Sequence, residues 1–180
     1  MMKQKYFFCD LDGTFIKEDM LFLSTQILLK ENPWKLISIL LGCWRGLPWA
    51  KDRIASSINT KKLDFSISKN VLKLIELKKA EGYICCLISG SNHNLVKEVF
   101  QQSKIFDDYF GSDTKINLVG KHKLKKIKKL TSDFEYIGNS KQDIPIWRYA
   151  DKAYICSSSK KFLERVVLLF PEATKIKPDR

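Results

Sequence analysis

The feature that most constrains the fold of this chain is an alternation between short apolar runs and longer amphipathic stretches. Four runs are typical of buried strands, because they are apolar without polar alternation: residues 5–10, 83–89, 134–138 and 153–156. Helical periodicity separates or follows them at residues 70–82, 92–102, 123–130, 143–150 and 160–170. Strands that alternate with helices predict an α/β fold, in which a parallel sheet carries helices on its faces.

One segment departs from this alternation. Residues 16–69 show no convincing strand, and their apolar pattern predicts two or three helices broken at Asn32-Pro33 and Gly46-Leu47-Pro48. We therefore expect an α/β core made of residues 1–15 and 70–180, with a helical insertion at 16–69 between the first and second strands. The last residues, KIKPDR, are expected to form a tail.

The charge balance indicates anionic partners. The chain carries 32 Lys and Arg against 20 Asp and Glu, a net charge of +12, which suits phosphorylated metabolites, nucleic acid or an anionic membrane surface. The lysine-rich stretch 121–129 places Leu124, Ile127 and Leu130 on one helical face, so most of its lysines are expected to face solvent. Since no aromatic residues are interleaved with them, we do not expect nucleic-acid binding.

The cysteines and the apolar runs indicate where the protein resides. None of the five cysteines forms a CxxC pair, and four lie in strand-like runs, which is typical of reduced, buried thiols. The N-terminus reaches Asp10 before any apolar core of signal-peptide length. The longest apolar run, residues 36–44, is far shorter than the ~20 residues of a membrane span. We expect a cytoplasmic protein.

Polar residues follow the predicted strands at the points where those strands end. Asp10, Asp12 and Thr14 follow the first strand, Ser89, Gly90 and Ser91 the second, and Asn139 and Asp143 the third, while Lys121 and Lys123 precede the third. The carboxyl ends of parallel strands meet at one edge of a sheet, so these side chains should converge. Carboxylates, a hydroxyl and a lysine suit phosphoryl transfer, in which a carboxylate attacks phosphorus, Mg²⁺ binds hard oxygen ligands, and cationic groups offset the phosphoryl charge.

These motifs resemble the phosphatase branch of the haloacid dehalogenase (HAD) superfamily. The sequence DLDGT is similar to its first motif, LIS to its second, the lysine after Gly120 to its third and GNSKQD to its fourth, in order from residue 5 to about 156. The resemblance implies a Rossmann-like three-layer α/β/α core with a parallel sheet and a small all-helical cap. It also implies Mg²⁺-dependent hydrolysis of a phosphomonoester through an aspartyl-phosphate.

The resemblance assigns roles residue by residue. Asp10 would be the nucleophile and a metal ligand, and Asp12 the general acid and base, with its backbone carbonyl on the metal. Thr14 would order the loop and is counted, with Ser89 and Gly90, among the residues that bind the phosphoryl group.

The third and fourth motifs leave two questions open. Asp143 would orient the metal site and is counted with the metal residues, as is Asn139, which stands where the family usually has a metal-binding aspartate. An amide oxygen can still bind Mg²⁺, although one negative charge is lost. Both Lys121 and Lys123 remain candidates for the motif lysine, and the alignment favours Lys123.

A finer resemblance concerns the stretches NPWKLISILL, NLVGKHK and GNSKQDIPIWRYAD. They are similar to the phosphatase-like domain fused ahead of ubiquinone-type membrane prenyltransferases, of which this chain would be a stand-alone relative. That resemblance implies a sugar phosphate or lipid-linked phosphate as substrate.

The apolar insertion, with Trp34, Trp44 and Trp49, has two interpretations: a packed cap core, or a lid that meets a lipid phosphate, a membrane surface or a protein partner. Peripheral membrane contact through the cap follows from the second. Two further hypotheses stay open: phosphotransfer to another acceptor, and an inactive HAD-like binding module.

Overall fold

A six-stranded parallel sheet forms the centre of the molecule. The computed structural model describes residues 4–179. The strands are β1 (Tyr6–Cys9), β2 (Ile84–Asn92), β3 (Asp108–Ser112), β4 (Phe134–Gly138), β5 (Lys152–Cys156) and β6 (Thr174–Ile176). Their order across the sheet is β3-β2-β1-β4-β5-β6, and every neighbouring pair is parallel. Because β1 lies between β2 and β4, the chain reverses its direction of travel across the sheet at β1.

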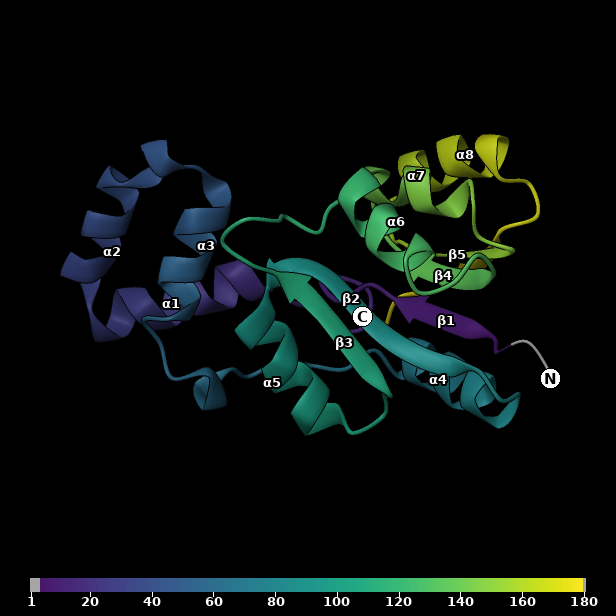
Figure 1. Cartoon of the computed structure of the whole chain (residues 1–180), viewed down its shortest axis with the longest axis horizontal. Coiled ribbons are helices and arrows are strands. Elements are labelled where there is room, and N and C mark those ends of the chain that lie inside the picture. The colour runs from purple at the N-terminus through teal and green to yellow at the C-terminus, as the bar shows by residue number, and fades with distance from the viewer. Residues whose placement is uncertain (1–3, 180) are drawn as a thin grey trace.

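Helices cover both faces of this sheet (Figure 1). Phe7 of β1 belongs to one apolar cluster, with residues of α4 (Lys69–Ala80) and α5 (His93–Ser103). Phe8 points to the opposite face and belongs to a second cluster, with residues of α6 (Lys121–Lys128), α7 (Ile144–Trp147) and α8 (Lys160–Leu169). Successive side chains of a strand point to opposite faces, so one short apolar run supplies both cores. The expected three-layer α/β/α class is confirmed.

The two edge strands were not predicted. β3 contains Asp108 and Gly111 and is only partly buried, and β6 is a three-residue strand that includes a lysine. Edge strands lack the continuous apolar pattern of strands that are covered on both faces. The expected C-terminal tail is therefore wrong over much of its length: Ile176 pairs with β5, and the Asp179 carboxylate accepts hydrogen bonds from the backbone N–H groups of Lys69 and Asn70.

Three helices form a separate cap layer between β1 and α4: α1 (Met20–Glu31), α2 (Pro33–Leu41) and α3 (Leu47–Ala55). Each start has a local cause. The Asp19 side chain accepts from the Phe22 N–H, the Asn32 side chain accepts from the Lys35 N–H, and Pro48 lies in the first turn of α3. The helices enclose a small core of their own, made of Leu28, Leu36, Ile39, Ala50 and Ile54.

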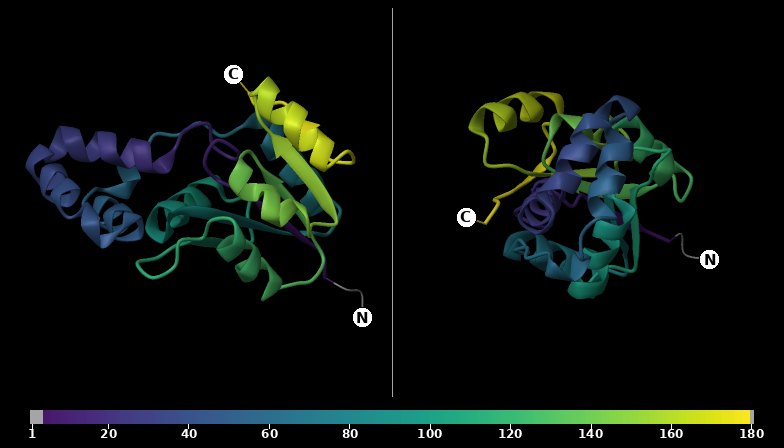
Figure 2. Two further views of the ribbon diagram at one scale, coloured as in Figure 1. Left: turned by 90° about the horizontal axis from the view of Figure 1, so that it is seen from above. Right: turned by 90° about the vertical axis from the view of Figure 1, so that its left-hand side faces the viewer.

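The cap lies beyond the carboxyl ends of the strands, toward which the arrowheads in Figure 1 point, and Figure 2 shows it at one end of the molecule. The two segments that join the cap to the core are hydrogen-bonded to each other. The Lys17 N–H donates to the Ser66 carbonyl, and the Ser68 N–H donates to the Phe15 carbonyl. Within residues 4–179, no helix has the length and apolarity needed to cross a membrane.

Candidate active site

The segment DLDGT forms a tight loop directly after β1. The Thr14 N–H donates to the Leu11 carbonyl (3.2 Å) and the Phe15 N–H to the Asp10 carbonyl (3.2 Å). Gly13 has a φ of +68°, and a Cβ there would lie 2.3 Å from the Asn139 amide nitrogen. Glycine therefore permits both the left-handed backbone and the close packing of this loop against the segment after β4.

Asp12 is held by three hydrogen bonds. Its Oδ1 accepts from the Met20 N–H (2.8 Å), and its Oδ2 accepts from the hydroxyls of Ser89 (2.9 Å) and Ser91 (2.7 Å). The donors are the backbone of Met20, the first residue of α1 in the cap, and two serines near the end of β2. The orientation of Asp12 is thus fixed jointly by the cap and the core.

Asp10 and Lys123 form a buried ion pair. The Lys123 Nζ lies 2.6 Å from Asp10 Oδ1, and the Thr14 hydroxyl is 3.4 Å from Oδ2. Burial raises the pKa of Asp10 to about 7, with Asp143 and Asp12 acting in the same direction and Lys123 acting against them. Burial acts to lower the pKa of Lys123, but the carboxylates of Asp10 and Asp143 outweigh it, so that pKa is raised. Lys123 is therefore a cation at neutral pH.

Asp143 lies next to this ion pair, and both oxygens of its carboxylate accept hydrogen bonds. Its Oδ2 accepts from the N–H groups of Asn139 (3.1 Å) and Ser140 (3.0 Å) and from the Ser140 hydroxyl (3.1 Å). Its Oδ1 accepts from the Tyr136 hydroxyl (2.6 Å) and is 3.8 Å from the Lys123 Nζ. These contacts favour a structural, orienting place for Asp143 over direct contact with a metal.

Asn139 is the residue of the fourth motif nearest the loop. Its Nδ2 donates to the Asp12 backbone carbonyl at 2.9 Å. Rotating the amide by half a turn would bring Oδ1 to the same place. In the part of the chain that the structure describes, no group of three or more His, Cys, Asp or Glu residues is arranged to hold a metal ion. The hard oxygen donors on hand are the Asp10 carboxylate, the Asp12 carbonyl and the Asn139 amide.

A cavity of about 550 Å³ opens above these groups and is lined by both the core and the cap. The insertion contributes Asp19, Leu21, Leu47 and Lys51. The Lys51 Nζ donates to the Gly90 carbonyl at 2.9 Å. Burial lowers the pKa of Lys51, against the opposing effect of Asp12 and Asp19. Next to it, the Asn92 amide donates to Asp52 (3.0 Å), which gives the cap another polar contact with the core.

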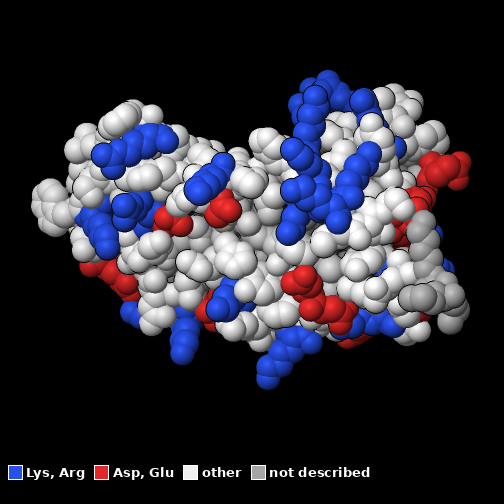
Figure 3. Space-filling model, viewed as in Figure 1, with Lys and Arg blue, Asp and Glu red and all other residues white. Residues whose placement is uncertain are grey.

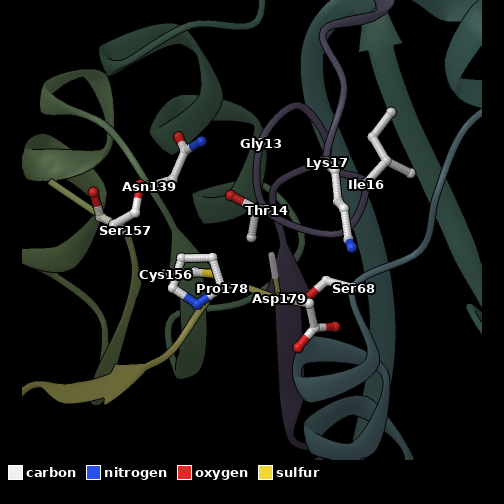
Figure 4. Close-up of a pocket in the computed structure, with 11 residues that line it drawn as sticks. Gly13, Thr14, Ile16, Lys17, Ser68, Asn139, Cys156, Ser157, Pro178 and Asp179 are labelled. Carbon is white, nitrogen blue, oxygen red and sulfur yellow. The ribbon is translucent and has the colours of Figure 1, made fainter.

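A second cavity, of about 320 Å³, lies on another side of the same loop (Figure 4). Gly13, Thr14 and Asn139 form part of its wall, with Ser68 and the C-terminal residues Pro178 and Asp179. It contains neither Asp10 nor Lys123, so the reactive groups face the larger cavity.

One curated protein is similar in sequence to most of this chain. No family model matches the chain. The chain is 25% identical to the uncharacterized protein y4nM of Sinorhizobium fredii over 173 residues, which are 96% of this chain and 34% of that protein. It thus spans about a third of the length of this curated relative.

Solved structures are similar over most of the chain. They include a HAD family hydrolase of Salmonella enterica serovar Typhi (TM-score 0.64, 14% identity, 89% of this chain and 65% of that one). A phosphoserine phosphatase in a phospho-aspartyl intermediate analogue is similar over 99% of this chain and 95% of its own (TM-score 0.61, 16% identity). The chain has the HAD fold. A protein of unknown function from Bordetella pertussis shares this architecture, with a TM-score of 0.75, 9% identity and coverage of 97% of this chain and 99% of that one.

Within the HAD fold of this chain, most of the predicted residues converge. Asp10, Asp12, Gly90, Lys123, Asn139 and Asp143 all line the larger cavity. Ser89 is fully buried and holds Asp12, and Thr14 is buried against Asp10. Lys121 is different: it is exposed at the start of α6, so the structure brings Lys123, and not Lys121, to the site.

Two residues of the site were not predicted, and a third was expected there without a role of its own. Ser91 was expected at the end of the second strand with Ser89, and the period of an extended segment could have indicated that the two share a face. The Tyr136 hydroxyl contacts both Asp143 and Lys123. Tyr136 lies two residues before Gly138 on β4, so the same two-residue period could have placed it on the face of the site. Lys51 reaches the site only through the placement of α3, for which the sequence carries no local signal.

Proposed function

We propose that this chain is a HAD-type phosphatase that hydrolyses a phosphomonoester through an aspartyl-phosphate on Asp10. The observation that carries the proposal is the buried contact of 2.6 Å between Asp10 and Lys123, in a cavity that Asp12 also lines. The Asp10 carboxylate attacks phosphorus, a carboxylate O–P bond forms, and the bond from phosphorus to the leaving oxygen breaks. Water then attacks the phosphorus, and inorganic phosphate leaves as Asp10 is restored.

Asp12 serves both halves of this reaction. It gives a proton to the leaving oxygen in the first half and takes one from the attacking water in the second. The hydrogen bonds from Met20, Ser89 and Ser91 hold the Asp12 carboxyl group in one orientation at the cavity. The group is therefore positioned before the substrate binds. Lys123 offsets the charge that gathers on the phosphoryl oxygens.

The donor set fits a Mg²⁺ ion, as the HAD resemblance implies. The Asp10 carboxylate, the Asp12 carbonyl and the Asn139 Oδ1 are hard oxygen ligands of the kind that Mg²⁺ prefers, and water can supply the remaining positions. When bound, Mg²⁺ would offset negative charge on the phosphoryl group. Asp143 would act indirectly, since its carboxylate is occupied by the N–H groups of Asn139 and Ser140 and thereby positions Asn139.

The substrate is proposed to be a small anionic phosphate ester, with a sugar or lipid-linked group beneath the cap. The resemblance to phosphatase-like domains fused to prenyltransferases supports the lipid-linked group, and Leu21 and Leu47 give the cavity an apolar side. Lys51 supplies a cation to the substrate. Lys51→Ala should raise KM about tenfold with a smaller change in kcat, because a charge-assisted hydrogen bond contributes about 1.5 kcal/mol.

The test is phosphate release from a panel of phosphomonoesters, including lipid phosphates, with Mg²⁺ and with EDTA. Wild type, Asp10→Asn and Lys121→Ala are compared. We expect metal-dependent release that Asp10→Asn abolishes and that Lys121→Ala, a change at an exposed lysine outside the cavity, preserves. Equal release by wild type and Asp10→Asn would refute the proposal.

A second candidate function is a catalytically weak protein that binds rather than turns over. The observation in its favour is Asn139, which removes one negative charge from the expected metal set. Asn139→Asp distinguishes the two. A phosphatase should keep its activity and require less Mg²⁺, whereas a binding protein would gain activity from the substitution or have none in either form. Transfer to an added alcohol acceptor, measured in the same assays, would instead indicate a phosphotransferase.

A further inference from the structure

The outer face of α2 is apolar and has no cover among the described residues. Leu36 and Ile39 point inward to the cap core. Trp34 (79% exposed), Ile37, Leu40 and Leu41 (77%) lie on the solvent side, and Trp44 (80%) continues this surface. An exposed apolar patch of this kind marks an interaction surface.

Cations lie beside this face. Lys35, Arg45 and Arg53 line a hollow of about 510 Å³ together with Trp44 and Trp49, and Ser38, Ser56 and Ser57 form other parts of its wall. The guanidinium carbons of Arg45 and Arg53 lie 5.1 Å and 5.8 Å from the centre of the Trp49 ring. Stacking on one ring holds both cations in place.

The charge of this hollow is not neutralised by the protein. No acidic residue lines it, and residues 32–51 contain neither Asp nor Glu. Within residues 4–179, none of Lys35, Arg45 and Arg53 takes part in a salt bridge. At the cap end of the molecule, Figure 3 shows basic side chains among uncharged surface, with acidic side chains nearby. An anion is the complement that such a hollow requires.

We propose that the cap docks on an anionic phospholipid surface through this face. Trp34, Leu41 and Trp44 enter the interfacial layer, and a lipid phosphate occupies the hollow of Lys35, Arg45 and Arg53. Tryptophan beside lysine and arginine is the side-chain set that suits a membrane interface. α2 lies at the end of the molecule remote from the sheet (Figures 1 and 2), so a flat surface can reach it without meeting the core. This inference does not depend on the proposed phosphatase activity.

The test is vesicle flotation, with phosphatidylcholine alone and with added phosphatidylglycerol, at low and high salt. Wild type should float only with the anionic vesicles and less at high salt. Arg45→Gln with Arg53→Gln should weaken binding about 25-fold, since each basic residue near such a surface contributes about fivefold. Leu41→Ser with Trp44→Ser should weaken it at least about tenfold, because buried apolar area is lost.

Matched controls change the same chemistry elsewhere. Leu168→Ser removes an equally exposed leucine (83%) from α8, and Lys125→Gln with Lys129→Gln removes two exposed charges from α6 and its C-cap. Both should float like wild type. All substituted side chains are exposed, and thermal unfolding checks that each variant is folded. Independently, tryptophan emission should shift to the blue on addition of anionic vesicles, and not in the Leu41→Ser, Trp44→Ser variant.

Three results would overturn the proposal. They are an absence of flotation with anionic vesicles at low salt, flotation of the cap variants equal to that of wild type, and a stable dimer in light scattering that Leu41→Ser with Trp44→Ser disperses. The last would assign the face to a second copy of this chain.

Discussion

Two buried lysines, Lys123 and Lys78, each form a polar cluster, and the two clusters lie at opposite ends of the same sheet. Only the Lys123 cluster lines the larger cavity. At the carboxyl end of β1, Lys123 contacts Asp10 at 2.6 Å. At the amino end of β4, Lys78 contacts Glu135 at 3.0 Å and also Glu81 at 2.8 Å. Each cluster includes at least one tyrosine hydroxyl, and each lysine side chain is less than a tenth exposed.

The clusters differ in how fully the carboxylate is satisfied. Glu135 accepts from the hydroxyls of Tyr83 (2.7 Å) and Tyr154 (2.8 Å) as well as from Lys78. Burial acts to raise the pKa of Glu135, but these hydrogen bonds outweigh it, and the pKa is lowered. Asp10 has one strong partner, and burial raises its pKa to about 7. A fully bonded carboxylate stabilises the fold, whereas an under-bonded one opposes folding and is free to react.

The largest expected effect follows from exchanging each carboxylate for its amide. Asp10→Asn should lower kcat/KM by more than about a thousandfold, because the proposed nucleophile is lost. Its free energy of unfolding at pH 8 should equal or exceed that of wild type, since a buried carboxylate with a raised pKa opposes folding. Urea unfolding and phosphate release measure the two quantities.

Glu135→Gln is the matched control for this change. It should leave kcat/KM within about twofold and lower the free energy of unfolding by about 2 kcal/mol, because it breaks a buried, hydrogen-bonded pair. If Asp10→Asn were the less stable variant, or Glu135→Gln the less active one, the contrast between the two clusters would be wrong.

The lysines give the next largest contrast. Lys123→Met should reduce kcat by about 10²-fold, as the loss of one electrostatic donor does in other sites. Lys78→Met should leave kcat unchanged and destabilise the fold by about 3 kcal/mol, because Glu135 loses its cation. Steady-state kinetics and urea titrations of both variants check this. Similar kcat losses in the two variants would mean that Lys123 acts only through stability.

The two carboxylates should also respond to pH with opposite signs. The lowered pKa of Glu135 contributes stability above its ordinary value of 4.5, and this is lost as the pH falls through the folded-state value. The difference in unfolding free energy between wild type and Glu135→Gln should therefore shrink below about pH 4.5.

The raised pKa of Asp10 acts the other way. Its stabilising contribution is complete below 3.8 and is lost as the pH rises through about 7. The free energy of unfolding of Asp10→Asn should therefore rise relative to that of wild type as the pH rises from 3.8 to about 7. Urea titrations repeated across the pH range measure this difference. A constant difference between these two proteins would contradict the assignment of Asp10.

The smallest effects are expected at the tyrosines. Tyr154→Phe should destabilise the fold by about 1 kcal/mol and leave activity unchanged, because one hydrogen bond to Glu135 is lost. Tyr136→Phe removes the hydroxyl between Asp143 and Lys123 and should be equally mild in stability. It should also lower kcat by a few fold, since the orientation of Lys123 changes. Equal kcat values for the two variants would exclude that positioning role.

The sequence predicted the parts of this molecule whose cause is local. Buried strands such as residues 153–156 are continuous apolar runs, and Asp10 and Asp12 follow such a run directly. The edge strands β3 and β6 could not be predicted, because their stability comes from pairing with β2 and β5. The same reason applies within the site. Lys51 reaches Gly90 across 39 positions of the chain through tertiary packing, and the second lysine cluster has no motif at all.

The most direct test of the central claim is to trap the phosphoryl group on the protein. Asp12→Asn retains the nucleophile but lacks the base for the second half of the reaction, so an intermediate should accumulate with an activated donor such as p-nitrophenyl phosphate. After an acid quench, mass spectrometry should locate one phosphoryl group on Asp10, and Asp12→Asn combined with Asp10→Asn should carry none. A phosphoryl group on Ser89, Ser91 or Asp143, or an unmodified protein that still releases phosphate, would contradict the account.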